Sequence, residues 1–252
     1  MQPPIKLLGY RPPSALLERR VLLITGAGQG LGKALAMACA ALGAHVILHG
    51  RGIAKLEKTY DEIVAASYAP PAIAPLDFAV ASDPDYERLA QTIGDEFGRL
   101  DGVVHCAAWL QRLQPLAQEK LDHWLALLRI NLAGPFALTR ACLPLLRRSE
   151  DASVIFTSES HAISPSAYWG GFAVAKSGLG TLLKIWAEEL ASAENLRMNL
   201  VVPGAMQSPQ RALTHPGEDK QKLPMPGQLV PAYLYLLGPD SKGITGKVFE
   251  LQ

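Results

Sequence analysis

The amino-acid sequence predicts an α/β fold: a doubly wound parallel sheet in three α/β/α layers, built as a single domain. Short apolar runs alternate with longer segments of helical periodicity, which is typical of a parallel sheet with helices on both faces. The apolar runs are nearly continuous in valine, isoleucine and leucine, as expected of strands that are buried on both faces. The 252 residues, of which 49% are hydrophobic, suffice for one such domain with a sizeable core.

The elements follow one another in the order that right-handed crossovers between parallel strands require. The predicted strands are Val21–Thr25, His45–Leu48, Ile73–Leu76, Gly102–His105, Ser153–Thr157, Met198–Val202 and Val248–Leu251. The predicted helices are Leu31–Leu42, Ala54–Ala66, Asp85–Phe97, Leu121–Leu146, Phe172–Ala193 and Leu229–Leu237.

Two segments stand outside this alternation. Residues 1–19 precede the first strand and are expected to form an arm. The proline-rich residues 205–227 follow the carboxyl end of a strand, so they form either a plain surface loop or a flap over a ligand. We call them the substrate loop.

Composition argues against several classes of partner. Charged residues make up 19% of the chain and the net charge is +1, which gives no electrostatic basis for binding nucleic acid or an anionic membrane. The longest apolar stretch, His123–Leu146, is interrupted by charged residues and does not read as a membrane span. The three cysteines are far apart and form no Cys/His cluster, so neither a disulfide framework nor a metal site is indicated. A reducing, cytoplasmic setting fits best.

A glycine-rich segment joins the first strand to the first helix. From Thr25 it reads TGAGQGLG, so that its candidate ligand-binding residues are Gly26, Gly28, Gly30, Leu31 and Gly32. Glycines let the backbone turn tightly and approach a pyrophosphate, and the free N–H groups at a helix start bind the anion. A strand before the segment and an apolar helix after it are the context that this mechanism requires.

The spacing of these glycines after a threonine resembles the fingerprint of the short-chain dehydrogenase/reductase family, as found in bacteria. The resemblance runs over nearly the whole chain and implies a Rossmann-type fold, a nicotinamide dinucleotide cofactor and assembly as a homodimer or homotetramer. It assigns further cofactor contacts by position: Asp77 to adenine, Ala107 to the turn beside the cofactor, Lys176 to the nicotinamide ribose, and Pro203, Gly204 and Ser208 to the nicotinamide side.

The end of the second strand favours NADP over NAD. An acidic residue there would bind the free ribose hydroxyl of NAD and repel a phosphate, but the position is occupied by Gly50. Arg51 follows, and its guanidinium can clasp the additional phosphate of NADP with help from Lys55. The alternative is that Arg51 is an ordinary solvated loop arginine.

The catalytic residues implied by the resemblance are only partly present. Active members use an asparagine, a serine, a tyrosine and a lysine, of which Asn131 and Lys176 are kept. Phe172 stands at the tyrosine position and has no ionisable proton, and Glu159 stands at the serine position. Because loss of a general acid costs about a hundred- to ten-thousandfold in rate, ordinary carbonyl reduction should be severely impaired.

Two functions therefore remain open. The chain is either a divergent NADP(H)-dependent oxidoreductase acting on a small carbonyl, alcohol or activated alkene, or a catalytically inactive NADP(H)-binding regulatory or partner protein. In the first case Glu159, Tyr168, His161 or a water serves as the proton partner. A structural alternative is that Glu159 forms an ion pair with Lys176, because both side chains are poorly tolerated when buried alone. We favour this pairing over a role of Glu159 as a replacement proton donor.

Overall fold

The computed structural model describes residues 7–252 and contains one sheet of seven parallel strands in the order β3-β2-β1-β4-β5-β6-β7. The strands are β1 (Val21–Thr25), β2 (His45–Gly50), β3 (Ala72–Pro75), β4 (Gly102–His105), β5 (Ala152–Thr157), β6 (Leu196–Val202) and β7 (Lys247–Glu250). The predicted doubly wound α/β fold is confirmed, and each strand lies within a few residues of its predicted position.

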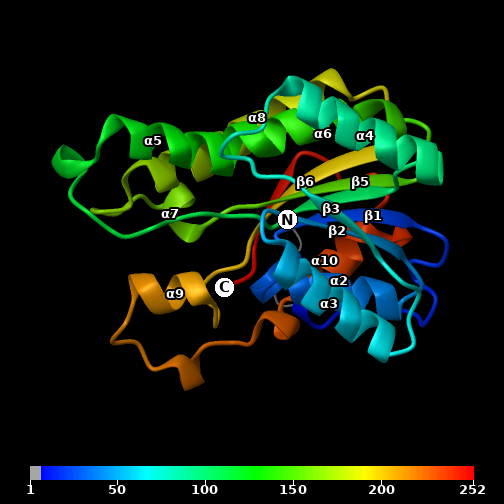
Figure 1. Ribbon diagram of the computed structural model, residues 1–252, viewed down its shortest axis with the longest axis horizontal. Helices are drawn as coiled ribbons and strands as arrows, with labels where there is room; N and C mark the ends of the chain where they lie inside the picture. Colours follow the sequence, from blue (N-terminus) through cyan, green and yellow to red (C-terminus); the bar gives the residue numbers. More distant parts are fainter. Residues whose placement is uncertain (1–6) are drawn as a thin grey trace.

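Helices cover both faces of the sheet (Figure 1). One face carries α4 (Asp83–Phe97), α6 (Gly134–Leu146) and α8 (Gly170–Glu189), and the other carries α2 (Gly30–Ala41), α3 (Ile53–Ala65) and α10 (Val230–Leu237). Two separate hydrophobic clusters result, because alternate strand residues point to opposite faces. On β1, for example, Leu23 belongs to the first cluster and Leu22 to the second.

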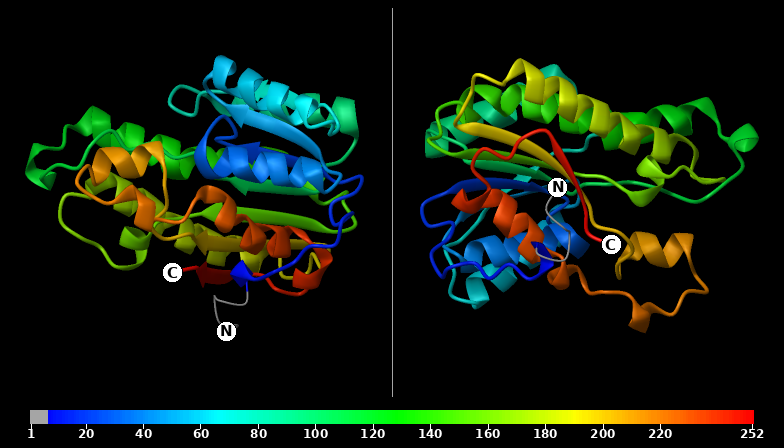
Figure 2. Two further views of the ribbon diagram at one scale, coloured as in Figure 1. Left: turned by 90° about the horizontal axis from the view of Figure 1, so that it is seen from below. Right: turned by 180° about the vertical axis from the view of Figure 1, so that it is seen from behind.

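The order in which the chain adds strands to the sheet reverses at β1. Strands β2 and β3 extend the sheet on one side of β1, whereas β4 pairs with its other side. Open parallel sheets bind ligands in the crevice outside the carboxyl ends of the strands at such a switch point. The short helices α7 (Ser160–Ile163) and α9 (Pro209–Thr214) lie at this same end of the sheet, as does α5 (Leu121–Leu128) (Figures 1 and 2).

The predicted single helix Leu121–Leu146 is divided. A π-helical turn, Arg129–Ala133, separates α5 from α6. Pro135 has no amide hydrogen to donate to the carbonyl four residues earlier, so the regular α-helical ladder is interrupted here. π-Helical turns of this kind occur frequently at functional sites.

The expected N-terminal arm is not free where the structure describes it. Residues 1–6 lie outside the described part, but Leu7 and Leu17 are fully buried against the α2 and α10 face. The Tyr10 hydroxyl donates to Asp240, and its ring meets that of Tyr235 edge to face at 5.4 Å. The described arm is therefore anchored to the core through these two leucines.

Charged residues at the amino ends of the strands form a closed network. Asp151, at the start of β5, accepts hydrogen bonds from Arg20 and from Arg197. Arg197 also donates to the carbonyls of Leu237 and Gly238, at the C-terminal end of α10. This pairing satisfies the exposed carbonyls of a helix end and neutralises a charge that would be costly to bury alone.

Candidate functional site

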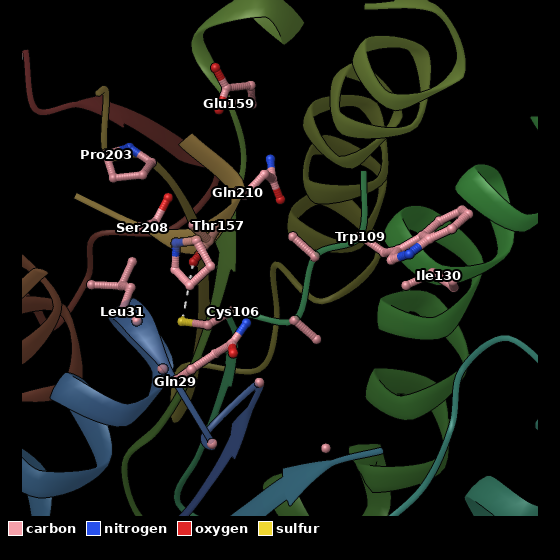
Figure 3. Close-up of a pocket in the computed structure, with 18 of the residues that line it drawn as sticks. Gln29, Leu31, Cys106, Trp109, Ile130, Thr157, Glu159, Pro203, Ser208 and Gln210 are labelled. Atoms are coloured by element: carbon pink, nitrogen blue, oxygen red, sulfur yellow. Dashed lines mark hydrogen bonds between the residues drawn. The ribbon is translucent and has the colours of Figure 1, made fainter. Parts of the chain in front are cut away.

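A cleft of about 510 Å³ opens at the carboxyl ends of the strands (Figure 3). Most of the residues singled out in the sequence line it: Gly26, Gly28, Gly30, Leu31, Gly32, Arg51, Asp77, Ala107, Glu159, Phe172, Lys176, Pro203, Gly204 and Ser208. Figure 3 shows Gln29 and Leu31 at one end of the cleft and Glu159 at the other. Asn131 and Tyr168 belong to neighbouring segments instead.

Close backbone packing explains the glycines at the start of α2. A Cβ atom on Gly26, whose φ is +68°, would lie 2.9 Å from the amide nitrogen of Ala107, and one on Gly32 would lie 2.4 Å from the Gly26 carbonyl oxygen. Gly28 packs against Lys55 in the same way. Gly30 differs, because its φ is +55° and a Cβ there would meet nothing within 4 Å. Its open side is available to a ligand.

The first turn of α2 suits an anion. The side chain of Gln29, which precedes the helix, makes no capping hydrogen bond. The first turn, all of which the structure describes, contains no acidic residue. The free N–H groups of a helix start carry partial positive charge and bind phosphate oxygens. Behind the turn, the Thr25 hydroxyl accepts a hydrogen bond from the Ala107 amide at 3.0 Å, which ties the ends of β1 and β4 together.

Positive side chains gather at the end of β2. Arg51 is exposed on the cleft, and the Lys55 ammonium donates to the Gln29 side chain at 2.6 Å. Asp77, after β3, accepts a hydrogen bond from the Ala79 amide at 2.9 Å and lines the same part of the cleft. These residues could hold the adenosine side of a dinucleotide that carries an additional phosphate.

A histidine missed by the sequence reasoning lies beneath this region. His49 is 1% exposed, and neither ring nitrogen has a hydrogen-bond partner among the described residues. Its ring packs on Phe78 at 4.8 Å between centroids, and burial lowers its pKa to about 4. On the other side of β1, in the same register, burial lowers the pKa of His105 to about 3. Both histidines are therefore neutral at ordinary pH.

Lys176 is held at the bottom of the cleft. Its ammonium donates to the Thr157 carbonyl at 2.9 Å, while the Ser158 hydroxyl donates to the Lys176 carbonyl at 3.0 Å. The ammonium also lies 5.8 Å from the centre of the Phe172 ring. Burial lowers the pKa of Lys176 to about 8, an effect that the charge of Glu159 partly opposes.

The prediction of an ion pair between Glu159 and Lys176 is wrong. Glu159 accepts hydrogen bonds from the Ser160 hydroxyl at 2.8 Å and from Nδ1 of His161 at 2.9 Å. The His161 ring is itself stacked on Trp169, with centroids 3.7 Å apart and planes 14° from parallel. This stack turns the imidazole toward Glu159, so the carboxylate has a partner without Lys176.

Asn131 positions the backbone of a loop. Its side-chain nitrogen donates to the carbonyls of Trp109 and Leu127, and its oxygen accepts from the Trp109 amide, each at 2.9 Å. Three of the four hydrogen bonds that this amide can make thus hold the segment after β4 against the helical segment around the π-helical turn.

Tyr168 lies apart from Phe172. Its φ of +75° places it before the start of α8 at Gly170, and 58% of the residue is exposed. The helix does not extend back to it, so the two rings do not share a helix face. Trp169, which sequence reasoning did not single out, occupies the cleft wall instead.

The substrate loop contributes another residue that the sequence did not indicate, Arg211. Its short helix α9 begins after Ser208, whose hydroxyl accepts from the Arg211 amide at 3.0 Å. The Arg211 guanidinium lines the cleft and is paired through two nitrogens with Glu218, each at 2.6 Å. A loop without periodicity gave no signal for either partner.

The parallel sheet, its switch-point cleft and the glycine turn define a Rossmann-type α/β protein. Residues 20–219 match the short chain dehydrogenase family model. The chain is 36% identical to the oxidoreductase YciK of Escherichia coli over 243 residues, 96% of both chains. The chain therefore belongs to the short-chain dehydrogenase family.

Solved structures agree with this assignment. A short chain dehydrogenase from Pseudomonas syringae is 41% identical, with a TM-score of 0.94 over 96% of this chain and 98% of that one. A short chain dehydrogenase from Shigella flexneri, solved in complex with NADP, is 36% identical, with a TM-score of 0.92 over 95% of this chain and 100% of that one.

Two kinds of feature are absent from residues 7–252. No helix there has the length and apolar character needed to cross a bilayer. In the same residues, no group of three or more His, Cys, Asp or Glu side chains is arranged to hold a metal ion.

Proposed function

We propose that the cleft binds NADP(H) and that the chain is an oxidoreductase acting on a small carbonyl, alcohol or activated alkene. The observation that carries the proposal is the glycine turn, where Gly30 leaves open space beside an uncapped helix start. Arg51, exposed nearby with Gly50 before it, supports NADP over NAD. The NADP complex of the related Shigella flexneri protein supports the same choice.

Each part of the cofactor has a proposed set of partners. The backbone of residues 26–32 would hold the pyrophosphate and Arg51 the additional phosphate. Family resemblance adds Asp77 for adenine, Lys176 for the nicotinamide ribose, and Ala107, Pro203, Gly204 and Ser208 around the nicotinamide. When bound, the reduced cofactor supplies a hydride. The substrate loop would cover the substrate end.

The proton-transfer groups are the divergent part. We propose that Phe172 and Glu159 occupy the tyrosine and serine positions of the family pattern. Phe172 is 1% exposed and supplies no proton, and Lys176 directs its ammonium at a backbone carbonyl. Glu159, backed by His161, is then the proposed proton partner in the cleft. The buried Phe172 also supports a second candidate, a non-catalytic NADP(H)-binding protein.

Cofactor titration and turnover together test these proposals. Purified protein is titrated with NADPH and NADH, and NADPH consumption is measured against a panel of substrates with polarised double bonds. The Phe172→Tyr, Glu159→Ser double variant serves as the comparison for carbonyls. Failure to bind either dinucleotide at millimolar concentration would overturn the cofactor assignment. Turnover by the wild-type protein overturns the non-catalytic candidate, whereas turnover by the double variant alone supports it.

We also propose assembly as a homodimer or homotetramer in the cytoplasm. Apolar side chains are exposed on α5 (Leu121 and Leu125) and on α8 (Val174 and Ile185). An apolar helix face of this kind is a common protein interface. Light scattering after gel filtration measures the assembly, and Ile185→Glu should shift it toward the monomer.

A further inference from the structure

The substrate end of the cleft has a carboxylate and aromatic rings where reduction of a carbonyl calls for hydroxyl donors. Glu159, Trp169 and Phe172 line this end together. Building on the proposed NADP(H)-dependent hydride transfer, we propose that the substrates are iminium ions, organic cations with a C=N⁺ bond. Toward them Glu159 acts as an anion, in place of the proton-partner role proposed above for carbonyls.

The proton balance of the two reactions separates these substrate classes. Hydride addition to a carbonyl leaves an alkoxide, which needs a proton from a general acid. An iminium carbon that receives hydride becomes an amine carbon, while the C=N π pair becomes the lone pair of nitrogen. The cation is reduced to a neutral amine, NADPH is oxidised to NADP⁺, and no proton is transferred. A phenylalanine at position 172 therefore costs this reaction nothing.

Glu159 provides the negative charge that such a substrate requires. The Ser160 hydroxyl and His161 Nδ1 both direct hydrogens at Oε1, as an acceptor-only carboxylate allows. Oε2 has no hydrogen-bond partner among the described residues and is free to face a cation. A carboxylate here would repel a developing alkoxide but attracts an iminium nitrogen.

Aromatic rings also line this end of the cleft. The rings of Trp169 and Phe172 lie 6.0 Å apart between centroids, and both residues are at least 95% buried. Indole and phenyl faces attract organic cations, most strongly when water is excluded. The stack of His161 on Trp169 fixes the carboxylate and one aromatic wall as a unit.

Two cations already lie at this end of the cleft, and each has a partner other than Glu159. Arg211 reaches the same end of the cleft, but its charge is paired with Glu218 through two short contacts. Lys176 gives a hydrogen bond to the Thr157 carbonyl at 2.9 Å, and its ammonium lies 5.8 Å from the centre of the Phe172 ring. Glu159 is therefore the carboxylate left to face a substrate among the described residues that line the substrate end, because its Oε2 has no hydrogen-bond partner there.

Binding of an unreactive cation tests the site without turnover. The probe is the N,N-dimethyl tetrahydroisoquinolinium ion, titrated by calorimetry into protein saturated with NADP⁺. We expect Glu159→Gln to weaken its binding by about 10- to 100-fold, because one charged partner is lost. Glu62→Gln, which removes an equal charge on α3 outside the cleft, should leave it unchanged. Equal binding by wild type and Glu159→Gln overturns the proposal.

Turnover then tests the substrate class. Wild-type protein with NADPH should reduce the N-methyl dihydroisoquinolinium ion at least about 100-fold faster, in kcat/KM, than the ketone tetralone, as expected from the missing acid. Faster reduction of tetralone overturns the iminium proposal but leaves hydride transfer standing. Lack of NADPH binding in fluorescence titration overturns the proposed function itself. NADPH binding without iminium binding overturns this inference alone.

Discussion

The polar side chains at the two ends of the strands differ in whether they are paired. At the amino ends, the charges of Asp151, Arg20 and Arg197 are paired with one another and with backbone carbonyls. At the carboxyl ends, Arg51 is exposed on a cleft and the ring of His49 has no partner among the described residues. Buried polar groups are normally satisfied inside a protein, so the exceptions indicate where a ligand belongs. The contrast separates residues kept for stability from residues kept for function.

The largest test of this contrast is Asp151→Ala. Arg197, whose side chain is 5% exposed, would lose its carboxylate partner, so the free energy of unfolding should fall by about 3–5 kcal/mol. Urea denaturation followed by circular dichroism measures the loss. Asp83→Ala breaks an exposed pair with Arg140 and should cost less than about 1 kcal/mol. NADPH affinity of folded Asp151→Ala should be unchanged, and a parallel loss of affinity would contradict the separation of the two ends.

Acid should lower the free energy of unfolding through the two buried histidines at the carboxyl ends of the strands. The pKa of His49 falls from 6.5 to about 4 on folding, and that of His105 falls to about 3. Since the unfolded chain binds these protons first, stability is complete above pH 6.5 and is lost as pH falls toward 4, by about 3 kcal/mol for each histidine. Urea midpoints measured across this range give the slope. His49→Leu should make it shallower, and an unchanged slope would refute the assignment to His49.

Arg51→Ala tests the cofactor end alone. Loss of a charge-assisted contact to the additional phosphate should weaken NADPH binding by about 10- to 100-fold and leave NADH binding as it was. Fluorescence titration with both dinucleotides measures the ratio. Because Arg51 is exposed and lies outside the amino-end network, the urea midpoint should not move. Equal weakening for the two dinucleotides would remove Arg51 as the residue that discriminates between them.

The smallest expected effect compares matched hydroxyls. Thr25→Val removes the acceptor of the Ala107 amide at the carboxyl end, and Ser153→Ala removes a donor to the Leu236 carbonyl at the other end. Each should cost about 1 kcal/mol of stability. Only Thr25→Val should also lower NADPH affinity, by a few-fold, because Ala107 lines the cleft. A similar loss of affinity in both variants would blur the comparison.

Local patterns predicted the scaffold of the site well. Alternating apolar runs and helical periodicity were enough for the sheet and its layers, since both are properties of neighbouring residues. The glycine turn and Arg51 were found because their spacing relative to a strand end carries the mechanism. These six residues line one cleft together with eight that were assigned by family resemblance.

Contacts between distant segments could not be predicted in the same way. The partner of Glu159 depends on how His161 stacks on Trp169, which no spacing rule contains. Tyr168 was considered as a proton donor, but a left-handed backbone turn places it outside the helix and exposes it. The buried, unpaired ring of His49 likewise depends on its contact with Phe78, far along the chain.

The π-helical turn at Arg129–Ala133 changes how two parts of a long helical segment can be used. One inserted residue rotates everything before it by about 100° relative to everything after it. α6 can thus keep its apolar stripe on the sheet while α5 turns a different side toward α8 and the wall around Trp169. A single-residue deletion in this turn would restore a continuous α-helix and rotate α5 about its axis relative to α6. The shape of the pocket wall therefore depends on the rotation between these two helices as well as on their side chains.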